Sequence, residues 1–318
     1  MDRLLSSAPM LAPPLEAVRP DVARLPIVFV NAYLVGEPGD ADRRSAPWAL
    51  VDTGLPHTAA LTRAAAEARF GVGARPEAIL LTHGHFDHAG SALALADAWD
   101  VPVYAHPLEL PYLTGRSDYA PPDPTIPGAI SFLSRTFSHA GTDLGAHVRA
   151  LPDDGAVPGM PGWTWLHTPG HTAGHTSFWR EQDRTLLSGD AVVTVDLDSW
   201  AALATMPRRF DRPPAPLTPD WDAARASVER LAALAPEAVG AGHGQAITGR
   251  HTANDLHTFA VHFLRPAEGR YTEQPAVADE SGIVSVPPPV ADPLPWRVGA
   301  GVAAGLALLA LRRRRSAV

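Results

Sequence analysis

The sequence predicts an α/β fold in which two β-rich halves each carry their helices on the outside. Short β-branched or apolar runs alternate with Ala-rich helical segments, and the alternation resumes after a Pro-rich stretch in the middle of the chain. With 318 residues and 46% hydrophobic content, the chain can form one large domain or two small ones. We expect one domain at residues 25–265, a loose leader at 1–24, a Pro-rich linker at 266–296 and an apolar segment at 297–318.

The first half is predicted to alternate between strands and helices. Its β-branched runs are bounded by Gly, Asp and Pro, whereas its Ala-rich segments repeat apolar residues at helical spacing. Strands are expected at 27–35, 48–51, 78–81 and 101–105, and helices at 59–70 and 91–99. Residues 111–145 are rich in proline and are expected to form a surface insertion with a short helix at 130–137.

The second half is predicted to begin with three short strands and then to alternate again between strand and helix. Strands are expected at 163–167, 177–179, 185–187, near 192 and at 238–240, and helices at 222–234 and 253–264. Together the halves predict two β-rich layers with helices on their outer faces.

Four potential metal ligands lie within six residues directly after the strand expected at 78–81. They are His83, His85, Asp87 and His88, in the sequence THGHFDH. Imidazole and carboxylate groups suit zinc or a similar divalent ion, and a strand-to-helix turn lets them converge without burying an unpaired charge. A solvated His-rich loop is the alternative, but histidines further along the chain favour a metal site.

Three further motifs follow expected strands of the second half. His171 lies in TPGHTAGH, where Pro and Gly form a tight turn that can hold one imidazole rigidly. His175, four residues later, is expected to have a supporting or packing role. Asp190 in SGD could lie between two cations or be an ordinary turn aspartate, and the glycines beside His243 in GHG allow close approach of the backbone.

The composition excludes several other kinds of chemistry. The chain has no Cys, which excludes disulfides and a thiol nucleophile, and no Lys, which excludes lysine Schiff bases and a Walker-type phosphate loop. A formal net charge of -8 disfavours a nucleic-acid-binding surface, because such surfaces are usually basic. We therefore expect a small-molecule substrate and no nucleic-acid partner.

The ordered motifs resemble the metallo-β-lactamase superfamily, whose pattern is HxHxDH, a later His often within PGHTxGH, an Asp and a final His. The resemblance covers about residues 27–264, and the PGHTxGH form is most similar to the glyoxalase II-like hydrolases and their lactonase relatives. It implies a four-layer αβ/βα sandwich with metals at one edge between the sheets. It also implies a dinuclear metal-dependent hydrolase that cleaves an ester, thioester or lactone.

The resemblance further implies how two divalent ions, zinc or else iron or manganese, divide the ligands. The first ion would be held by His83, His85 and His171, the second by Asp87, His88 and His243, and Asp190 would bridge them. A hydroxide shared by the ions would attack the carbonyl carbon. Asp87 and Asp190 are the catalytic carboxylates in this scheme, and Asp87 or a metal-bound water would carry a proton to the leaving group.

Several residues outside the ligand set have weaker interpretations. Asp52, in VDTG, would orient a ligand histidine or simply form a turn, and His106 is expected to be structural. Aromatic and methionine side chains could contact substrate or lie in the core, and the candidates are Tyr112, Tyr119, Phe132, Trp200, Met206 and Phe210.

Two other functions remain compatible with the sequence. A mononuclear iron enzyme resembling persulfide dioxygenases would use two His and one Asp, so His88 and His243 favour the dinuclear hydrolase. The other alternative is a non-catalytic, membrane-tethered metal-binding protein, which the C-terminus suggests.

The C-terminus contains a short apolar run followed by four arginines. Residues 298–311 are small or apolar, but a helix needs roughly twenty such residues to span a bilayer. Arginines occupy positions 312–315. Because residues 1–20 lack a secretory pattern, we expect a cytoplasmic protein whose tail contacts anionic lipid peripherally, packs on the domain or is disordered.

Overall fold

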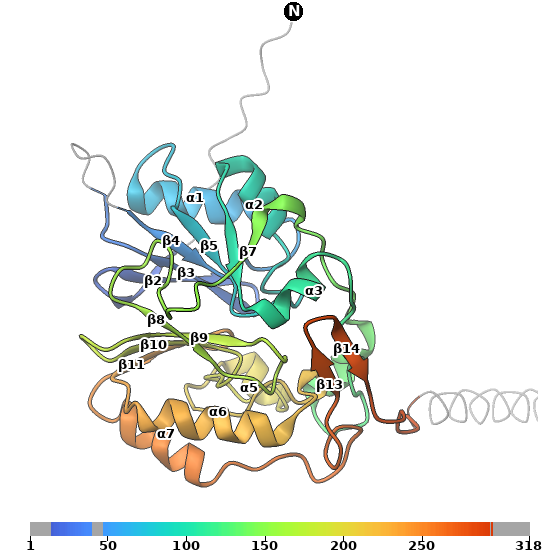
Figure 1. Cartoon of the computed structure of the whole chain (residues 1–318). Coiled ribbons are helices and arrows are strands. Elements are labelled where there is room, and N and C mark those ends of the chain that lie inside the picture. The colour runs from blue at the N-terminus through green and yellow to red at the C-terminus, as the bar shows by residue number, and fades with distance from the viewer. Residues whose placement is uncertain (1–13, 40–46, 293, 295–318) are drawn as a thin grey trace, which may run out of the picture.

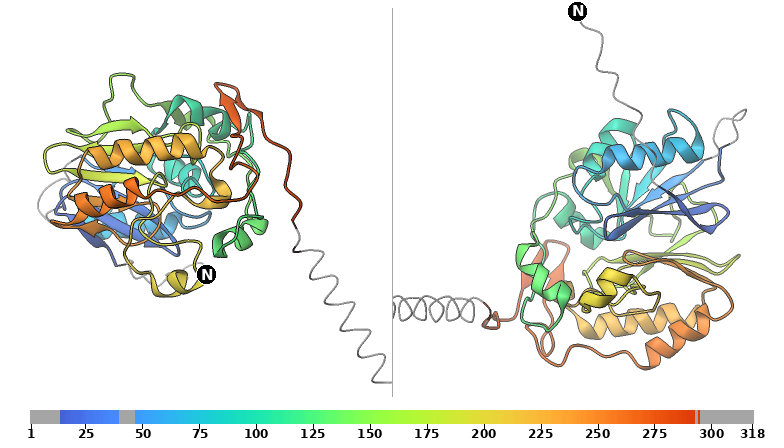
Figure 2. Two further views of the ribbon diagram at one scale, coloured as in Figure 1. Left: turned by 90° about the horizontal axis from the view of Figure 1, so that it is seen from below. Right: turned by 180° about the vertical axis from the view of Figure 1, so that it is seen from behind.

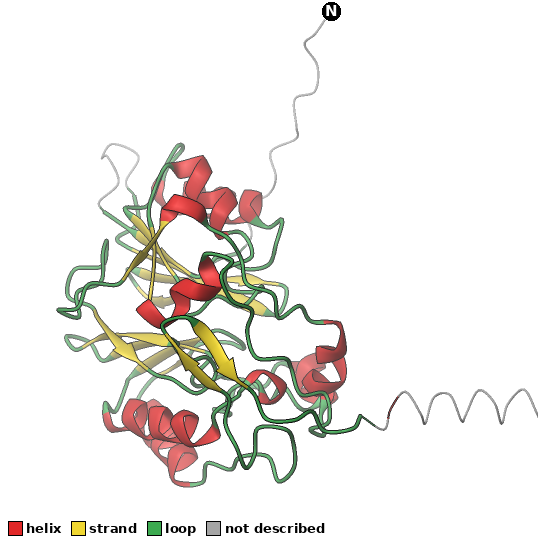
Figure 3. Cartoon of the chain, turned by 45° about the vertical axis from the view of Figure 1, so that its right-hand side comes forward, coloured by secondary structure: helices red, strands yellow, loops and turns green. Residues whose placement is uncertain are grey.

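Two β-sheets face each other, and helices cover the outer face of each, in the computed structural model (Figure 1). The structure describes residues 14–39, 47–292 and 294. A view turned by 45° shows the sheets between two layers of helix (Figure 3). This is the predicted four-layer αβ/βα sandwich, in which each half of the chain contributes one sheet.

The first sheet contains seven strands in chain order. β1 to β4 pair antiparallel, and β4 to β7 then pair in parallel. Parallel neighbours need crossover connections, and α1 (Ala59–Phe70) and α2 (Ala92–Trp99) supply two of them. The strands are β1 (Glu16–Arg19), β2 (Val22–Ile27), β3 (Val30–Val35), β4 (Ala49–Val51), β5 (Ala78–Leu80), β6 (Val103–Ala105) and β7 (Val148–Ala150).

The second sheet has the order β12-β11-β10-β9-β8. Its strands are β8 (Thr164–His167), β9 (Thr176–Arg180), β10 (Thr185–Gly189), β11 (Ala238–Ala241) and β12 (Ile247–Thr248). The helices of this half are α5 (Trp200–Thr205), α6 (Trp221–Ala233) and α7 (Thr252–Val261). Seen from below, α6 and α7 lie across the outer face of the sheet (Figure 2).

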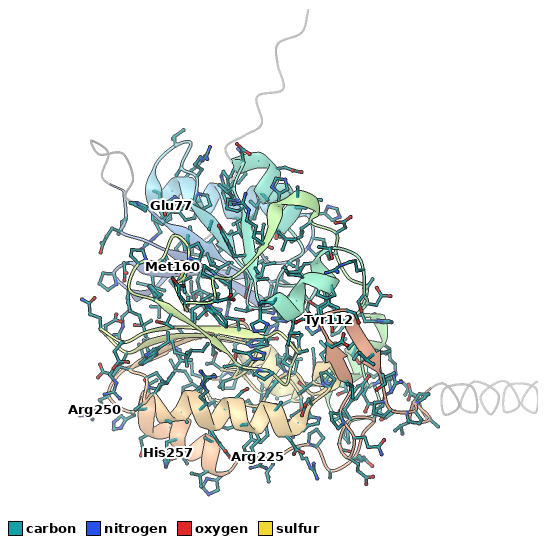
Figure 4. The ribbon with its side chains drawn as sticks, in the orientation of Figure 1. Glu77, Tyr112, Met160, Arg225, Arg250 and His257 are labelled. Atoms are coloured by element: carbon teal, nitrogen blue, oxygen red, sulfur yellow. The ribbon has the colours of Figure 1, made fainter. Side chains whose placement is uncertain are left out.

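Apolar side chains fill three layers of core. All six residues of β3 are buried, as expected for a strand covered on both faces. Trp48 stacks on Phe70 with ring centroids 4.4 Å apart, which attaches α1 to the first sheet. Met160, labelled in Figure 4, lies between the sheets in a cluster with Leu80 and Phe178. The two sheets are therefore joined by a continuous apolar interface.

The loose leader predicted for residues 1–24 is wrong in its second half. β1 and the start of β2 lie there and pair antiparallel, which extends the first sheet at its edge. Arg24 is only 5% exposed, and it donates to Asn31 Oδ1 at 2.8 Å and to Glu16 Oε2 at 2.6 Å. The strand pair is possible because these acceptors satisfy a charged side chain that the sequence alone assigns to solvent.

Two strand predictions differ from the structure in detail. The run at 27–35 is not one strand, because the chain reverses at Val28, whose φ is 59°, between β2 and β3. The strand expected near 192 is wrong, since Val193 makes only an isolated bridge with Asp211.

The Pro-rich linker predicted at 266–296 is also partly wrong, because it contains a β-hairpin. β13 (Val277–Asp279) and β14 (Gly282–Ser285) pair antiparallel beside α3 (Leu110–Leu113) (Figure 1). The Ile283 amide donates to Ser117 Oγ at 3.2 Å, and the Tyr271 hydroxyl donates to the Pro121 carbonyl at 2.6 Å. These contacts fix the segment on the central insertion, whose predicted short helix is α4 (Ala129–Leu133).

The apolar segment at 297–318, for which membrane contact was predicted, lies outside the described residues. Within 14–39, 47–292 and 294, no helix combines the length and apolarity that crossing a bilayer requires.

Candidate metal centre

The histidine cluster occupies the loop between β5 and α2, at the carboxyl end of a parallel strand. His83 and His88 are fully buried, and His85 and Asp87 are each 6% exposed. Asp52 fixes the start of the loop, because its Oδ1 accepts a hydrogen bond from the Thr82 amide at 2.8 Å. The four predicted ligands are therefore held below the surface at a position where α/β proteins commonly bind ligands.

The other three predicted ligands follow strands of the second sheet. His171 lies between β8 and β9, Asp190 directly follows β10, and His243 follows β11. Each of them is at most 4% exposed. The two sheets thus deliver side chains from distant parts of the sequence to one edge of the sandwich.

The seven predicted ligands form three overlapping groups. In each group the candidate donor atoms lie within 4.8 Å of one another, and the groups are His83, His85 and His171; His83, His88 and Asp190; and Asp87, His88 and His243. The structure therefore brings together every residue that the sequence selected. Which ion each residue holds stays a prediction.

Asp190 has the central position among these groups. Its Oδ2 lies 3.2 Å from His243 Nε2, 3.4 Å from His171 Nε2 and 3.5 Å from His88 Nε2. On one side of it, His85 Nδ1 and His171 Nε2 are 3.0 Å apart. Asp190 thus faces His171 of the first group and His243 of the third, and a carboxylate in that position can lie between two cations.

Neighbouring groups determine which ring nitrogen of each histidine faces the centre. His88 Nδ1 lies 2.8 Å from Asp52 Oδ2, and His243 Nδ1 donates to the Phe29 carbonyl at 2.8 Å. Both contacts assign the ring hydrogen to Nδ1 and leave the Nε2 lone pair directed at the centre. Asp52 thus contacts one of the predicted ligand histidines, which is the orienting contact expected for it.

Three buried atoms at the centre have no hydrogen-bond partner among the described residues. They are His83 Nε2, His88 Nε2 and Asp190 Oδ1. Leaving one buried polar atom unpaired costs about 1–3 kcal/mol. Cations bound by these lone pairs would remove that cost, and a set of imidazole and carboxylate donors without thiolate suits zinc, iron or manganese. The residues present therefore fit divalent metal ions.

Burial keeps the histidines of the first group neutral. It lowers the pKa of His85 to about 3, and it lowers the pKa values of His83 and His171 well below the ordinary range. Metal binding requires an unprotonated imidazole nitrogen. These three rings therefore stand ready to bind without first losing a proton.

The carboxylates make the other part of the centre attractive to positive charge. Burial opposes charge on His88, but Asp190, Asp52 and Asp87 together raise its pKa well above the ordinary value. Burial also opposes ionisation of Asp190, yet His243 and His88 hold its pKa well below the ordinary range. No arginine among the described residues forms an ion pair with these carboxylates. A divalent cation would supply the charge that a proton on His88 otherwise supplies.

Close packing around Asp190 depends on a glycine and a histidine. A Cβ at Gly242 would overlap Asp190 Oδ1 and lie 2.7 Å from His88 Cε1, so only glycine fits there. His175 Nε2 accepts from the Asp190 amide at 2.9 Å, and its Nδ1 lies 2.9 Å from Thr168 Oγ1. The supporting role predicted for His175 is confirmed, since the ring holds the backbone of the central carboxylate.

Residues 25–243 match the sequence profile of the metallo-beta-lactamase superfamily. The chain belongs to this superfamily. The matched region runs from within β2 through β11 and ends at His243, so all seven predicted ligands of the metallo-beta-lactamase centre lie within it.

Known relatives of this metallo-beta-lactamase-superfamily chain include metallo-hydrolases. The probable metallo-hydrolase YflN of Bacillus subtilis is 41% identical over 237 residues, which cover 74% of this chain and 88% of that protein. The hydroxyacylglutathione hydrolase of Bdellovibrio bacteriovorus is 33% identical over 115 residues, covering 36% of this chain and 34% of that protein. Family and relatives together support a metallo-hydrolase with a His/Asp metal site.

A solved structure supports the fold. A B3 metallo-beta-lactamase described as having an active-site glutamic acid superposes with a TM-score of 0.53 at 21% identity. The superposition covers 79% of this chain and 89% of that one. At this identity the likeness shows a shared metallo-beta-lactamase sandwich.

Glu109 is a fully buried carboxylate beside the metallo-beta-lactamase centre that sequence reasoning missed. It ends a 3-10 turn after β6, and burial raises the pKa of its carboxyl group although four hydrogen bonds lower it. No local motif marks it. The signal available in the sequence was an acidic residue directly after an apolar strand, which is weak evidence on its own.

The carboxylate of Glu109 ties two ligand loops together. Its Oε2 accepts from the Gly84 amide at 3.0 Å and from the Tyr119 hydroxyl at 2.5 Å. Its Oε1 accepts from the Thr172 hydroxyl at 2.6 Å and from the Gly174 amide at 3.0 Å. The loop of the first two histidines and the PGHTAGH loop are therefore joined through one side chain.

The six side chains suggested for substrate contact lie in three different surroundings. Met206 lines the cavity beside the centre. Three others are buried in the fold, namely Tyr112, Tyr119 and Phe210. Phe132 on α4 and Trp200 on α5 are 49% and 57% exposed, and their ring centroids are 5.8 Å apart.

His106 is structural, as predicted. Its Nδ1 accepts from the Leu108 amide at 3.1 Å, and its ring stacks on His167 at 4.1 Å.

Proposed function

We propose that this metallo-hydrolase uses two divalent ions to cleave an ester, thioester or lactone. The observation that carries the proposal is the convergence of seven buried donors in three overlapping groups with Asp190 at the centre. A mononuclear iron dioxygenase would leave His88 and His243 without a role. The ions are proposed to be zinc, with iron or manganese as alternatives.

The first proposed role of the chain is to hold the ions in place. His83, His85 and His171 would hold one, and Asp87, His88 and His243 the other, with Asp190 between them. When bound, such ions acidify water and polarise a carbonyl oxygen. This chemistry needs no serine or cysteine nucleophile.

The reaction adds water across one bond. The carbonyl carbon gains an OH group, its bond to the leaving oxygen or sulfur breaks, and the leaving atom gains a proton. Asp87 is the proposed carrier of that proton, because it lines the substrate cavity and burial raises the pKa of its carboxyl group. Asp52 and His175 act through other residues by fixing His88 and the Asp190 backbone.

Metal analysis and a substrate panel test the proposal. We expect about two divalent ions per chain and hydrolysis of at least one of an ester, a thioester and a lactone. A β-lactam is added to the panel. Fewer than one ion per chain, together with no hydrolysis of any of these compounds, would refute the proposal. Oxygen uptake with one iron per chain would instead identify the persulfide dioxygenase alternative.

Variants at two aspartates separate catalysis from stability. Loss of a residue that only supports a metal ligand reduces activity by up to roughly 100-fold. Asp190→Asn changes a proposed ligand itself, so it should reduce the rate of hydrolysis by more than that. Asp97→Asn changes an aspartate on α2 whose side chain is 63% exposed, and it should keep wild-type activity. Equal activity in both variants would contradict the central role of Asp190.

A further inference from the structure

A cavity of about 480 Å³ opens beside the metal centre. Fifteen residues line it, and four of them, His85, Asp87, Asp190 and His243, belong to the centre. The other eleven are apolar. The volume lies within the range typical of pockets for small molecules.

One wall is the turn between β2 and β3. Val28 and Phe29 form its tip, where Val28 is 84% exposed and has a φ of 59°. A left-handed backbone is uncommon for a β-branched residue, and such outliers are concentrated at functional sites. The Phe29 ring stacks with His243 at a centroid distance of 6.0 Å. This turn therefore places apolar surface directly beside a ligand of the centre.

A second wall is formed by α4 and the segment that leads into α5. The Ile130 amide donates to the Leu197 carbonyl at 3.1 Å, and both side chains pack in a cluster with Leu203 and Met206. The view from behind shows α4 and α5 side by side (Figure 2). Leu133 on α4 lines the cavity and is 36% exposed, so it stands at the rim.

Away from the metal centre, the walls lack a group that could neutralise an anion. None of the described residues lining the cavity is an arginine, and the chain has no lysine. A carboxylate on the bound part of a substrate would lose its hydration without gaining a counter-ion, which is unfavourable. An uncharged, apolar acyl chain would instead bind favourably, because its transfer from water to the pocket lowers the free energy.

We propose that this pocket binds the uncharged, apolar acyl group of the substrate and discriminates against acyl groups that carry a carboxylate. The inference rests on the proposed hydrolytic function and narrows its substrate class. It predicts that esters whose acyl group ends in a carboxylate are poorer substrates than neutral esters with the same acyl chain length. Each methylene added to the acyl chain should raise kcat/KM about fourfold until the chain outgrows the pocket.

The test compares p-nitrophenyl esters of acetate, butyrate, hexanoate and octanoate, hydrolysed by full-length protein carrying its metal. The mono-p-nitrophenyl ester of adipate has the six-carbon chain of the hexanoate ester with a carboxylate at its end. We expect kcat/KM to rise along the neutral series and to be at least about tenfold lower for the adipate ester than for hexanoate. Equal values for these two esters, or a flat series, would overturn the inference.

Charge variants at the rim distinguish binding from general damage. Leu133→Arg should raise kcat/KM for the adipate ester relative to hexanoate, and Leu133→Glu should lower that ratio. Leu93→Glu is the matched control, because Leu93 is a helical leucine with 39% exposure that does not line the cavity. The control should leave the ratio unchanged. A ratio that moves in the same direction for both Leu133 variants would contradict a charge-selective pocket.

Calorimetric binding of octanamide separates this inference from the proposed function. Octanamide is neutral and resembles the acyl group, and suberic acid monoamide is its anionic counterpart with the same eight-carbon chain. If octanamide binds at least about tenfold more tightly but no ester, thioester or lactone is hydrolysed, the proposed function is wrong and the pocket preference is supported. If esters are hydrolysed without regard to length or charge, the pocket inference is wrong and the proposed function stands.

Discussion

Glu109→Gln tests how strongly one carboxylate holds the two ligand loops together. The variant keeps the shape of the side chain but replaces one acceptor oxygen with an NH2 group. The hydroxyls of Tyr119 and Thr172 can rotate to accept from that group, whereas the backbone amides of Gly84 and Gly174 can only donate. Whichever way the new amide is oriented, one backbone N–H loses its acceptor. The free energy of unfolding should therefore fall by about 1–3 kcal/mol.

Urea unfolding of the metal-free protein measures this loss as a lower midpoint with an unchanged slope. Glu77, labelled in Figure 4, is exposed and provides the control. Glu77→Gln should lie within about 0.5 kcal/mol of wild type. A Glu109→Gln protein as stable as wild type would refute the view that the four hydrogen bonds fix the loops.

The loss of stability caused by Glu109→Gln should also depend on pH, in a direction set by the shifted pKa of Glu109. Burial raises the pKa of the Glu109 carboxyl above its ordinary value of 4.5, so the folded state binds this proton more readily than the unfolded state. The stability that the carboxyl contributes is complete below that value and decreases as pH rises toward the folded pKa. Glutamine does not titrate. The stability gap between wild type and variant should therefore narrow as pH rises above 4.5, and a gap that widens would contradict this sign.

Three further predictions concern the centre and its supports. Asp52→Asn should weaken metal binding about 10–100-fold, because it disturbs the partner of His88 Nδ1, and competition with a chelator measures this loss. Chelation should lower the thermal midpoint, since free ion at about 100 times Kd stabilises a protein by about 2.7 kcal/mol, and an unchanged midpoint would argue against a bound ion. Asn31→Ala should destabilise the protein by about 2–4 kcal/mol in urea, because Arg24 Nε and the Ala241 and Gly244 carbonyls lose their partner. Stability within about 0.5 kcal/mol of wild type would show that water replaces those bonds.

The fold class and the convergence of the candidate metal ligands could be predicted because their signals are local. The helix at 59–70 has both predicted ends, since its Ala-rich periodicity stops at Gly71. The seven ligands lie in four short motifs whose order is typical of one superfamily. Their mutual distances, however, depend on how two sheets face each other, which no single motif contains.

What the sequence did not reveal depends on partners far along the chain. Glu109 is defined by contacts with Gly84 and Gly174, and the latter is 65 residues away. The reversal at Val28 contains neither Gly nor Asn, so no turn signal interrupts its apolar run. The hairpin of β13 and β14 was hidden by its proline-rich surroundings and is fixed by Ser117 in the central insertion.

The two halves of the chain divide the metal donors between them, four before β7 and three after β8. Neither half alone presents the complete set, so ion binding is coupled to docking of one sheet on the other. A chain cut at the exposed residues 153–154 would therefore bind its ions tightly only when the two fragments reassociate. Metal content would then act as a direct readout of fragment complementation, with no need for a substrate.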